Sequence, residues 1–228
     1  MENDLPPLEV ETASNPEYAV IWLHGLGADG SDFEPIVPYL GLDPSVPIRF
    51  VFPNAPQIPV TCNGGFVMPA WYDIITLAPD SREIDEAGLA VSSASIRQLI
   101  AREAARGIPA QQVFLAGFSQ GGAVAYLTGL THSEPLAGIM ALSTYMPSPL
   151  QVAHAATPAS RDTPLFIAHG TQDAVVSLAL GEIARDTVAQ LGCEFEWHTY
   201  PMGHEVCLPE IQAIGAWINA QTSSRQTS

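Results

Sequence analysis

The sequence contains no lysine, and its eight basic residues, all arginines, stand against 24 acidic ones, which gives a formal net charge of −16. Without lysine there can be no Schiff-base lysine, no phosphate-loop lysine and no nucleophile activated in a Ser–Lys pair. A protein with this charge repels nucleic acid and anionic lipid surfaces, because both carry dense negative charge. We therefore expect no nucleic-acid partner and no chemistry that depends on an amine side chain.

Cysteines and long apolar runs are also scarce. Cys62, Cys193 and Cys207 are widely spaced and form no C-x-x-C pair, which indicates reduced thiols in a reducing compartment. The amino terminus is acidic where a secretory signal is basic. No stretch approaches the roughly 18 consecutive apolar residues of a membrane span. The sequence thus predicts a cytoplasmic protein without a membrane span.

Hydrophobic side chains are abundant, at 47% of the 228 residues, whereas only 14% are charged. This composition is typical of a globular protein with a large core, and the length suits a single domain over residues 1–228. We expect residues 1–14 and 222–228 to be peripheral or frayed, because chain ends are commonly poorly ordered.

Short apolar runs alternate with stretches of helical periodicity, the pattern of a mostly parallel sheet with helices on both faces. The predicted strands are 18–23, 48–52, 113–116, 136–142, 165–168 and 193–200. The predicted helices are 84–105, the stretch from the glycines after residue 119 to about 130, 178–191, and a last one from near residue 209. Residues 53–80 show little periodicity, which predicts a long functional loop.

The segment Gly117-Phe-Ser119-Gln-Gly121 matches the G-x-S-x-G pattern of a serine nucleophile. The pattern alone arises by chance in roughly one chain in ten of this length. Here, however, an apolar strand runs into it and an Ala-rich helix runs out of it. Such a bend strains its apex residue and needs glycines nearby, where Cβ atoms would clash. Ser119 is therefore the candidate nucleophile, and the alternative is a serine that only caps the helix.

A serine hydroxyl is a weak nucleophile until an imidazole takes its proton, and a carboxylate must orient that imidazole. In serine hydrolases with such a bend, the acid and then the histidine follow the serine along the chain. His204 lies in a turn between the last predicted strand and the final helix, which places it at the sheet edge where Ser119 is expected. His204 is therefore the candidate base.

The other histidines after Ser119 are weaker candidates. His169 and His198 lie in or beside predicted strands and are expected to be structural, whereas His132 and His154 lie in predicted polar loops and are expected to be exposed. None of these spacings matches a zinc site. No metal is therefore predicted.

For the orienting carboxylate, Asp173 lies in the loop that follows the predicted strand 165–168. Asp162 precedes that strand, at the opposite edge of the sheet, and Asp186 lies inside a predicted helix. Asp173 is therefore the candidate that would accept the Nδ1 proton of the base and leave Nε2 facing the serine.

Acyl transfer places negative charge on the former carbonyl oxygen, and a backbone N–H aimed at that oxygen contributes roughly 3–4 kcal/mol to transition-state stabilisation. One donor is expected from Gln120, the residue after the nucleophile. The other is expected from Leu26, because Gly25 and Gly27 on either side let its N–H turn toward the site. The alternative for this segment is an ordinary glycine turn.

With these pieces in place, the sequence resembles the carboxylesterase/phospholipase family that includes the acyl-protein thioesterases, and the similarity to its bacterial carboxylesterase branch is close. Six motifs spread over nearly the whole chain carry the resemblance: His24-Gly-Leu-Gly-Ala-Asp-Gly30, Phe52-Pro-Asn-Ala-Pro56, Met68-Pro-Ala-Trp-Tyr-Asp73, Gly117-Phe-Ser-Gln-Gly-Gly122, His169-Gly-Thr-Gln-Asp173 and Met202-Gly-His204. The resemblance implies an α/β-hydrolase fold without a large cap domain, with a triad and oxyanion donors at the residues already named.

The resemblance also implies that Phe66, Met68 and Trp71 line an apolar acyl groove. The sequence departs from the family pattern at Ser177, where proline is usual, and at Glu205, where a small or polar residue is commoner. Glu205 could face water, or it could act on the neighbouring histidine through its charge.

We expect a serine carboxylesterase that hydrolyses short- to medium-chain carboxylic esters, with capacity for acyl-thioesters, through an acyl-Ser119 intermediate and without a cofactor. An acyl-protein thioesterase or a lysophospholipase on the same triad is the alternative, since substrate choice depends on loop shape. A peptidase, a lipase and a non-catalytic binding member of the fold have less support. Relatives often form dimers, so a homodimer is an open prediction.

Overall fold

The computed structural model describes residues 6–78 and 81–226. Seven strands form one sheet in the order β1-β3-β2-β8-β9-β10-β11, in which β1 alone is antiparallel to its neighbour. They are β1 (Leu8–Glu11), β2 (Tyr18–Leu23), β3 (Ile48–Phe52), β8 (Val113–Phe118), β9 (Gly138–Leu142), β10 (Leu165–Gly170) and β11 (Phe195–Tyr200). The mostly parallel sheet of an α/β-hydrolase fold is therefore confirmed.

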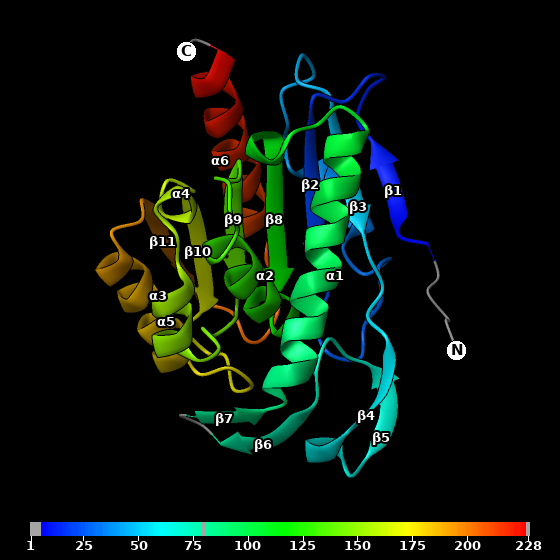
Figure 1. Ribbon diagram of the computed structural model, residues 1–228. Helices are drawn as coiled ribbons and strands as arrows, with labels where there is room; N and C mark the ends of the chain where they lie inside the picture. Colours follow the sequence, from blue (N-terminus) through cyan, green and yellow to red (C-terminus); the bar gives the residue numbers. More distant parts are fainter. Residues whose placement is uncertain (1–5, 79–80, 227–228) are drawn as a thin grey trace.

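Helices cover both faces of this sheet (Figure 1). One face carries α1, α2, α3 and α5, and the other carries α6. The α-helices are α1 (Glu86–Ala105), α2 (Gln120–Leu130), α3 (Pro149–Ala155), α4 (Pro158–Arg161), α5 (Leu178–Leu191) and α6 (Leu208–Gln226). Short 3-10 helices are η1 (Glu34–Tyr39), η2 (Thr61–Asn63) and η3 (Ala110–Gln112).

The strand β2 shows how the sequence provides an apolar surface for the helices on both faces of the sheet. All six of its residues are buried, and they alternate between two hydrophobic cores because successive side chains of a strand point to opposite faces. The core against α1 and α2 takes Ala19, Ile21 and Leu23, and the core against α6 takes Tyr18, Val20 and Trp22. A strand covered on both faces is apolar throughout, so it can be recognised in the sequence as a continuous apolar run.

Residues 53–80, predicted as a long loop, instead contain most of two small antiparallel hairpins. The first pairs β4 (Gln57–Val60) with β5 (Phe66–Pro69), and the second pairs β6 (Ile74–Ala78) with β7 (Ser81–Ile84). Neither hairpin is part of the main sheet, and much of each strand is exposed. Because the strands are only partly buried, they lack the continuous apolar pattern that marks the strands of the main sheet. Within the described ranges, no large cap domain accompanies them.

Several predicted boundaries are wrong. The helix predicted from residue 84 begins at Glu86, since the Asp85 side chain caps it by accepting the Ala87 N–H at 3.1 Å. Two short helices, α3 and α4, were not predicted. Their lengths, seven and four residues, give too little periodicity to be recognised.

Both chain ends carry regular structure. Residues 8–11, expected to be peripheral or frayed, form the edge strand β1 paired with β3, which is a peripheral position. The helix α6 continues to Gln226, and Thr222 within it is buried. Residues 1–5 and 227–228 lie outside the described residues. None of the described helices combines the length and apolar character needed to cross a membrane.

Candidate active site

Ser119 lies at the bend between β8 and α2, with φ 54° and ψ −120°. A positive φ is uncommon for a residue other than glycine and persists only where the surroundings enforce it. The surroundings are crowded: a Cβ at Gly117 would lie 2.3 Å from the carbonyl oxygen of Gly121, and one at Gly121 would lie 2.6 Å from that of His24. The Thr144 hydroxyl also donates to the Ser119 carbonyl at 2.6 Å. The bend therefore has the strained geometry that the G-x-S-x-G pattern predicts.

Three side chains that are distant in the sequence meet beyond the carboxyl ends of the strands. His204 Nε2 is 2.8 Å from Ser119 Oγ, and His204 Nδ1 is 2.7 Å from Asp173 Oδ2. A carboxylate can only accept a hydrogen bond, so Nδ1 carries the proton and Nε2 accepts from the serine hydroxyl. All three predicted residues thus lie in the contacts that activation of a serine nucleophile requires.

The loop that carries Asp173 holds its carboxyl in place. Oδ1 accepts from the N–H groups of Val175 and Val176, both at 2.8 Å, while Oδ2 faces His204. Burial raises the pKa of this carboxyl, but the hydrogen bonds from His204 and the two amides outweigh burial and keep the Asp173 pKa below its ordinary value. The carboxylate therefore stays charged at neutral pH and can stabilise a protonated imidazole.

Two other histidines are structural, as predicted. His169 is buried, with Nε2 at 2.9 Å from the Val176 carbonyl, and burial lowers its pKa. His198 stacks on Phe166 with ring centroids 4.7 Å apart. Neither ring contacts Ser119 in place of His204.

The remaining two histidines differ from expectation. His132 was expected to be exposed, but only 9% of it is. Its Nδ1 lies 3.0 Å from the Glu134 carbonyl, and Thr157 at the start of α4 donates to the His132 carbonyl. His154 is exposed as predicted, although it lies on α3 and not in a loop.

The two backbone amides predicted to bind an oxyanion belong to residues that line the cavity at Ser119. Gln120 is the first residue of α2, where N–H groups have no acceptor inside the helix and the helix dipole is positive. Leu26 precedes Gly27, which has φ 78° and donates its own N–H to the Pro69 carbonyl at 2.8 Å. This placement fits two donors beside the nucleophile.

Buried hydrogen bonds join the two segments that carry these amides. The Gln120 side chain accepts from the Trp71 N–H at 2.9 Å and donates to the Tyr72 carbonyl at 2.7 Å. The Trp71 indole donates to the His24 carbonyl at 2.9 Å, and His24 Nε2 accepts from the Ala55 N–H at 3.1 Å. All five residues are buried. We call them the buried frame, because they fix the loop around Leu26 relative to the bend at Ser119.

A cavity of about 230 Å³ opens beside Ser119. Its apolar walls come from the loop around Leu26 (the oxyanion loop), the β6–β7 hairpin, the loop after β9 and the loop after β10: Leu26, Ile74, Leu77, Tyr145, Val175 and Val176. Asp32 and Arg82 are the charged residues among its lining, apart from the catalytic candidates. The cavity is therefore a small apolar site with few polar groups, the usual character of a small-molecule site.

The three residues predicted to line an acyl groove are not among those that line this cavity. Phe66 is 73% exposed on the β4–β5 hairpin, and Trp71 belongs to the buried frame. The Met68 sulfur lies 3.8 Å from the position that a Cβ would take at Gly27, beside the oxyanion loop. The hairpin that contributes to this cavity is the second one, β6–β7, and no pattern in the sequence separates residues 53–84 into two hairpins.

The two departures from the family pattern leave the site intact. Glu205 is exposed, which agrees with the orientation toward water. Ser177 is the N-cap residue of α5 with φ −60°, a value that proline also adopts, so the backbone there is the one a proline would give. Within residues 6–78 and 81–226, no group of three or more His, Cys, Asp or Glu side chains could hold a metal ion.

The sequence profile of the phospholipase/carboxylesterase family matches residues 7–222. The chain belongs to this family. It is 40% identical over 217 residues to acyl-protein thioesterase 1 of Neurospora crassa, covering 92% of this chain and 89% of that protein. Acyl-protein thioesterase 1 of Mycosarcoma maydis is 39% identical over 217 residues, covering 89% and 90%. The crystal structure of Arabidopsis thaliana SOBER1 superposes with a TM-score of 0.84 at 32% identity, covering 90% of this chain and 99% of that one.

These relatives show that the family member described here is a serine hydrolase of the acyl-protein thioesterase and carboxylesterase group. They also correct one expectation. The relatives come from fungi and a plant, so the bacterial branch suggested by the sequence is not supported.

Proposed function

We propose that this family member is a serine carboxylesterase that hydrolyses short- to medium-chain carboxylic esters, and acyl-thioesters as well, through a covalent acyl-Ser119 intermediate. The observation that carries the proposal is the continuous contact from Ser119 Oγ through His204 to Asp173, at 2.8 Å and 2.7 Å. The cavity of about 230 Å³ beside the hydroxyl supports the acyl length, since sites for drug-sized ligands span about 300–1,000 Å³.

In the first half of the reaction, Ser119 Oγ attacks the acyl carbon while His204 Nε2 takes the hydroxyl proton. The negative charge that develops on the former carbonyl oxygen is stabilised by the N–H groups of Leu26 and Gln120. The protonated His204, stabilised by the Asp173 carboxylate, then gives its proton to the leaving alcohol or thiol. The bond between the acyl carbon and the leaving group breaks, and an acyl-Ser119 ester remains.

In the second half, His204 takes a proton from water, and the hydroxide formed attacks the acyl carbon of the acyl-enzyme. The same two amides stabilise the second oxyanion. His204 then returns the proton to Ser119 Oγ as the carboxylic acid leaves, which restores the starting state. The scheme uses only groups of this chain and water.

A second candidate is removal of acyl groups from S-acylated proteins. The relatives named acyl-protein thioesterase 1, at 40% and 39% identity over most of the chain, favour it. A thiol leaves more readily than an alcohol, so the same Ser119, His204 and Asp173 would serve both reactions. Lysophospholipid hydrolysis is the third substrate class to compare, because the family includes phospholipases by name.

Labelling and turnover together test the proposal. We expect a fluorophosphonate probe to add one label to the native protein by intact mass, and none to Ser119→Ala. We also expect hydrolysis of p-nitrophenyl butyrate to fall by roughly 10⁴–10⁶-fold in that variant. Ser160→Ala changes a buried serine in the capping box of α4, where Thr157 is the N-cap, and this serine does not line the cavity. It is the matched control and should keep both label and turnover.

Competition among an ester, an acyl-thioester peptide and a lysolipid on the native protein ranks the candidates by kcat/KM. A native protein that takes no label and cleaves none of the three substrates would be a non-catalytic binding member of the fold. Best turnover on sixteen-carbon p-nitrophenyl esters would overturn the proposed acyl length.

A further inference from the structure

A second, larger cavity adjoins the one at Ser119. Its volume is about 500 Å³, and both cavities are lined by Arg82 and Tyr145. Its apolar walls come from β7, the loop before α3, the first residue of α3, and α5: Ile84, Met146, Pro147, Pro149, Leu180 and Ile183. We call this second cavity the outer groove. Its charged lining residues are Arg82, Glu83 and Glu86. The outer groove thus joins an apolar wall to a charged margin, directly beyond the proposed acyl site.

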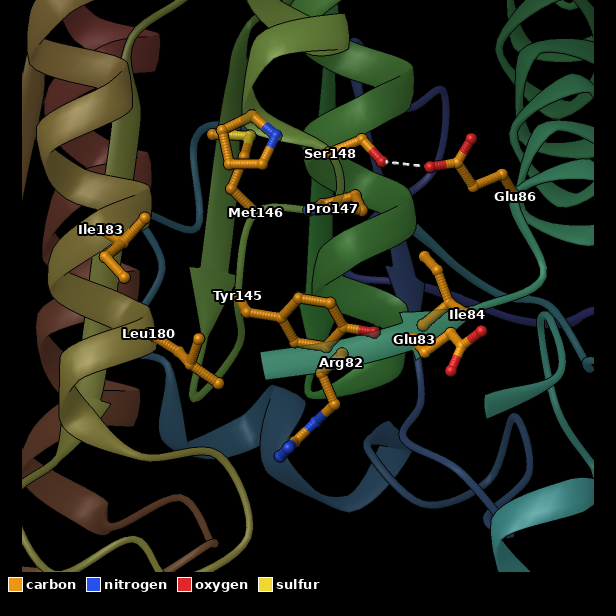
Figure 2. A pocket seen from close by; sticks show the side chains of 11 residues that line it. Arg82, Glu83, Ile84, Glu86, Tyr145, Met146, Pro147, Ser148, Leu180 and Ile183 are labelled. Atoms are coloured by element: carbon orange, nitrogen blue, oxygen red, sulfur yellow. Dashed lines mark hydrogen bonds between the residues drawn. The ribbon is translucent and has the colours of Figure 1, made fainter. Parts of the chain in front are cut away.

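The two residues shared by the cavities form a partition. Figure 2 shows the Tyr145 ring at the centre of the outer groove, between Leu180 and Ile84, with Arg82 beside it. The Tyr145 hydroxyl is 2.6 Å from that of Tyr72, which is fully buried. The Arg82 guanidinium lies over the Tyr145 ring, 5.8 Å from its centroid. The hydrogen bond to Tyr72 therefore holds the Tyr145 ring in place, and the Arg82 side chain packs against that ring.

Arg82 is held across the partition by backbone carbonyls. One guanidinium nitrogen donates to the Ala78 carbonyl at 2.6 Å, within the β6–β7 hairpin, and the other donates to the Val175 carbonyl in the loop that carries Asp173. The side chain thus bridges the hairpin to the opposite wall. A chain of methylene groups that passed from the cavity into the outer groove would have to displace these bonds.

The far end of the outer groove is also bounded. The Ser148 hydroxyl donates to Glu86 at 2.7 Å, from the residue before α3 to the first residue of α1 (Figure 2). The Gln151 amide donates to the same carboxylate at 3.2 Å. The outer groove therefore has a finite length between Arg82 and this contact.

Building on the proposed esterase function, we propose that Arg82 is the residue that limits acyl-chain length, because it separates the cavity at Ser119 from an outer groove suited to the distal methylene groups of a longer acyl chain. With Arg82 in place, a short acyl group fills the cavity. Without it, a longer chain extends past Tyr145 and buries its end against Leu180 and Ile183. Each methylene that leaves water contributes about fourfold in binding.

The experiment compares p-nitrophenyl butyrate with p-nitrophenyl dodecanoate on the full chain and measures the dodecanoate-to-butyrate ratio of kcat/KM. Arg82→Ala should raise this ratio about 15-fold, equivalent to two further buried methylenes. Arg82→Met, which keeps the length of the side chain but loses its hydrogen bonds, should raise the ratio as well. Because both esters are hydrolysed by the same active molecules, partial unfolding of a variant does not change the ratio.

Two matched variants complete the test. Arg185→Ala removes an arginine of α5 that lies over Trp197, away from the cavities, and should leave the ratio unchanged. Ile183→Gln in the Arg82→Ala background places a polar group in the outer groove and should return the ratio toward the native value.

A ratio within twofold of native in both Arg82 variants would overturn the inference while leaving the proposed function intact. A raised ratio that is indifferent to Ile183→Gln would also overturn it, since the acyl chain would then lie elsewhere. If the native protein failed to hydrolyse butyrate, the proposed function itself would be wrong, and the inference would fall with it.

Discussion

The two sides of the cavity at Ser119 are built by different means. On the oxyanion side, His24 and Trp71 are only 1% and 4% exposed, and side-chain hydrogen bonds tie them to the bend at Ser119. On the opposite side, Leu77 and Val175 are 49% and 52% exposed, and they lie on the β6–β7 hairpin and in the loop after β10. The reacting groups are thus held by a buried polar network, whereas the substrate wall consists of partly exposed apolar side chains.

The contrast has a physical reason. An unpaired buried polar group costs about 1–3 kcal/mol, so a network in which every member has a partner allows few alternative arrangements. Apolar contacts carry no such directional constraint. We therefore expect the reacting groups to keep one arrangement, and the apolar wall that meets the substrate to tolerate substitution better. The following substitutions test this division, beginning with the largest expected effect.

Asp173→Asn should reduce kcat/KM for p-nitrophenyl butyrate by roughly 10³–10⁴-fold. The amide can donate to His204 Nδ1, which favours the tautomer whose Nε2 carries the proton and cannot accept the one from Ser119. Steady-state kinetics measure the loss. Asp162→Asn, at the opposite edge of the sheet, should remain within about twofold of native. Comparable losses in both variants would contradict the assigned role.

Glu210→Gln tests a buried carboxyl in the first turn of α6, shortly after His204. Burial raises its pKa from 4.5 to about 8, and Tyr200 and Cys207 lie nearby. Between these pH values the folded protein binds more protons than the unfolded chain, so this carboxyl lowers stability as pH rises from 4.5 to 8. Glutamine cannot ionise, so the variant does not lose this stability. As pH rises from 4.5 to 8, its free energy of unfolding should increase relative to that of the native protein by about 2–4 kcal/mol, or roughly 5–15 °C in Tm.

Thermal unfolding of the native protein and Glu210→Gln at pH 5 and pH 8 measures this difference. The exposed Glu205→Gln is the matched control and should show no change in the slope of Tm against pH. An equal difference between Glu210→Gln and native at the two pH values would show that the carboxyl is not buried as described.

Trp71→Phe tests the buried frame. The ring is retained, but the hydrogen bond from the indole to the His24 carbonyl is lost, so the loop around Leu26 is held less firmly. We expect kcat to fall about tenfold, because a small displacement of an oxyanion donor weakens transition-state binding more than substrate binding. A change confined to KM would place Trp71 in the substrate wall instead.

Leu77→Ala and Phe66→Ala form a matched pair on the two hairpins. Leu77 lines the cavity, so its truncation should raise KM for p-nitrophenyl hexanoate about threefold to tenfold and leave kcat nearly unchanged. Phe66 is more exposed but lies away from the cavity, and its truncation should change neither constant by more than about twofold. A larger effect of Phe66→Ala than of Leu77→Ala would instead support the acyl groove that the sequence predicted at Phe66, Met68 and Trp71.

Much of this fold can be predicted from the sequence for two reasons. Its main strands are buried on both faces, and the bend at Ser119 carries glycines at positions where a Cβ would clash with the backbone. The strand β2 and the segment around Ser119 are examples. The hairpins were missed for the complementary reason: half-exposed residues such as Phe66 and Leu77 carry no clear periodicity. The positions of Met68 and Trp71 could not be read either, since a motif marks a segment without showing which side chain turns toward the site.

The sequence by itself determined the six parallel strands of the main sheet and the four longer helices, the strained bend at Ser119, and the choice of His204 and Asp173, because each depends on local pattern and on position relative to a strand end. Only the tertiary structure decided what surrounds those groups: the buried frame of His24, Trp71 and Gln120, the cavity walls, and the partition at Arg82. These features depend on contacts between residues 31 to 93 positions apart, and no local pattern encodes which distant side chains will meet.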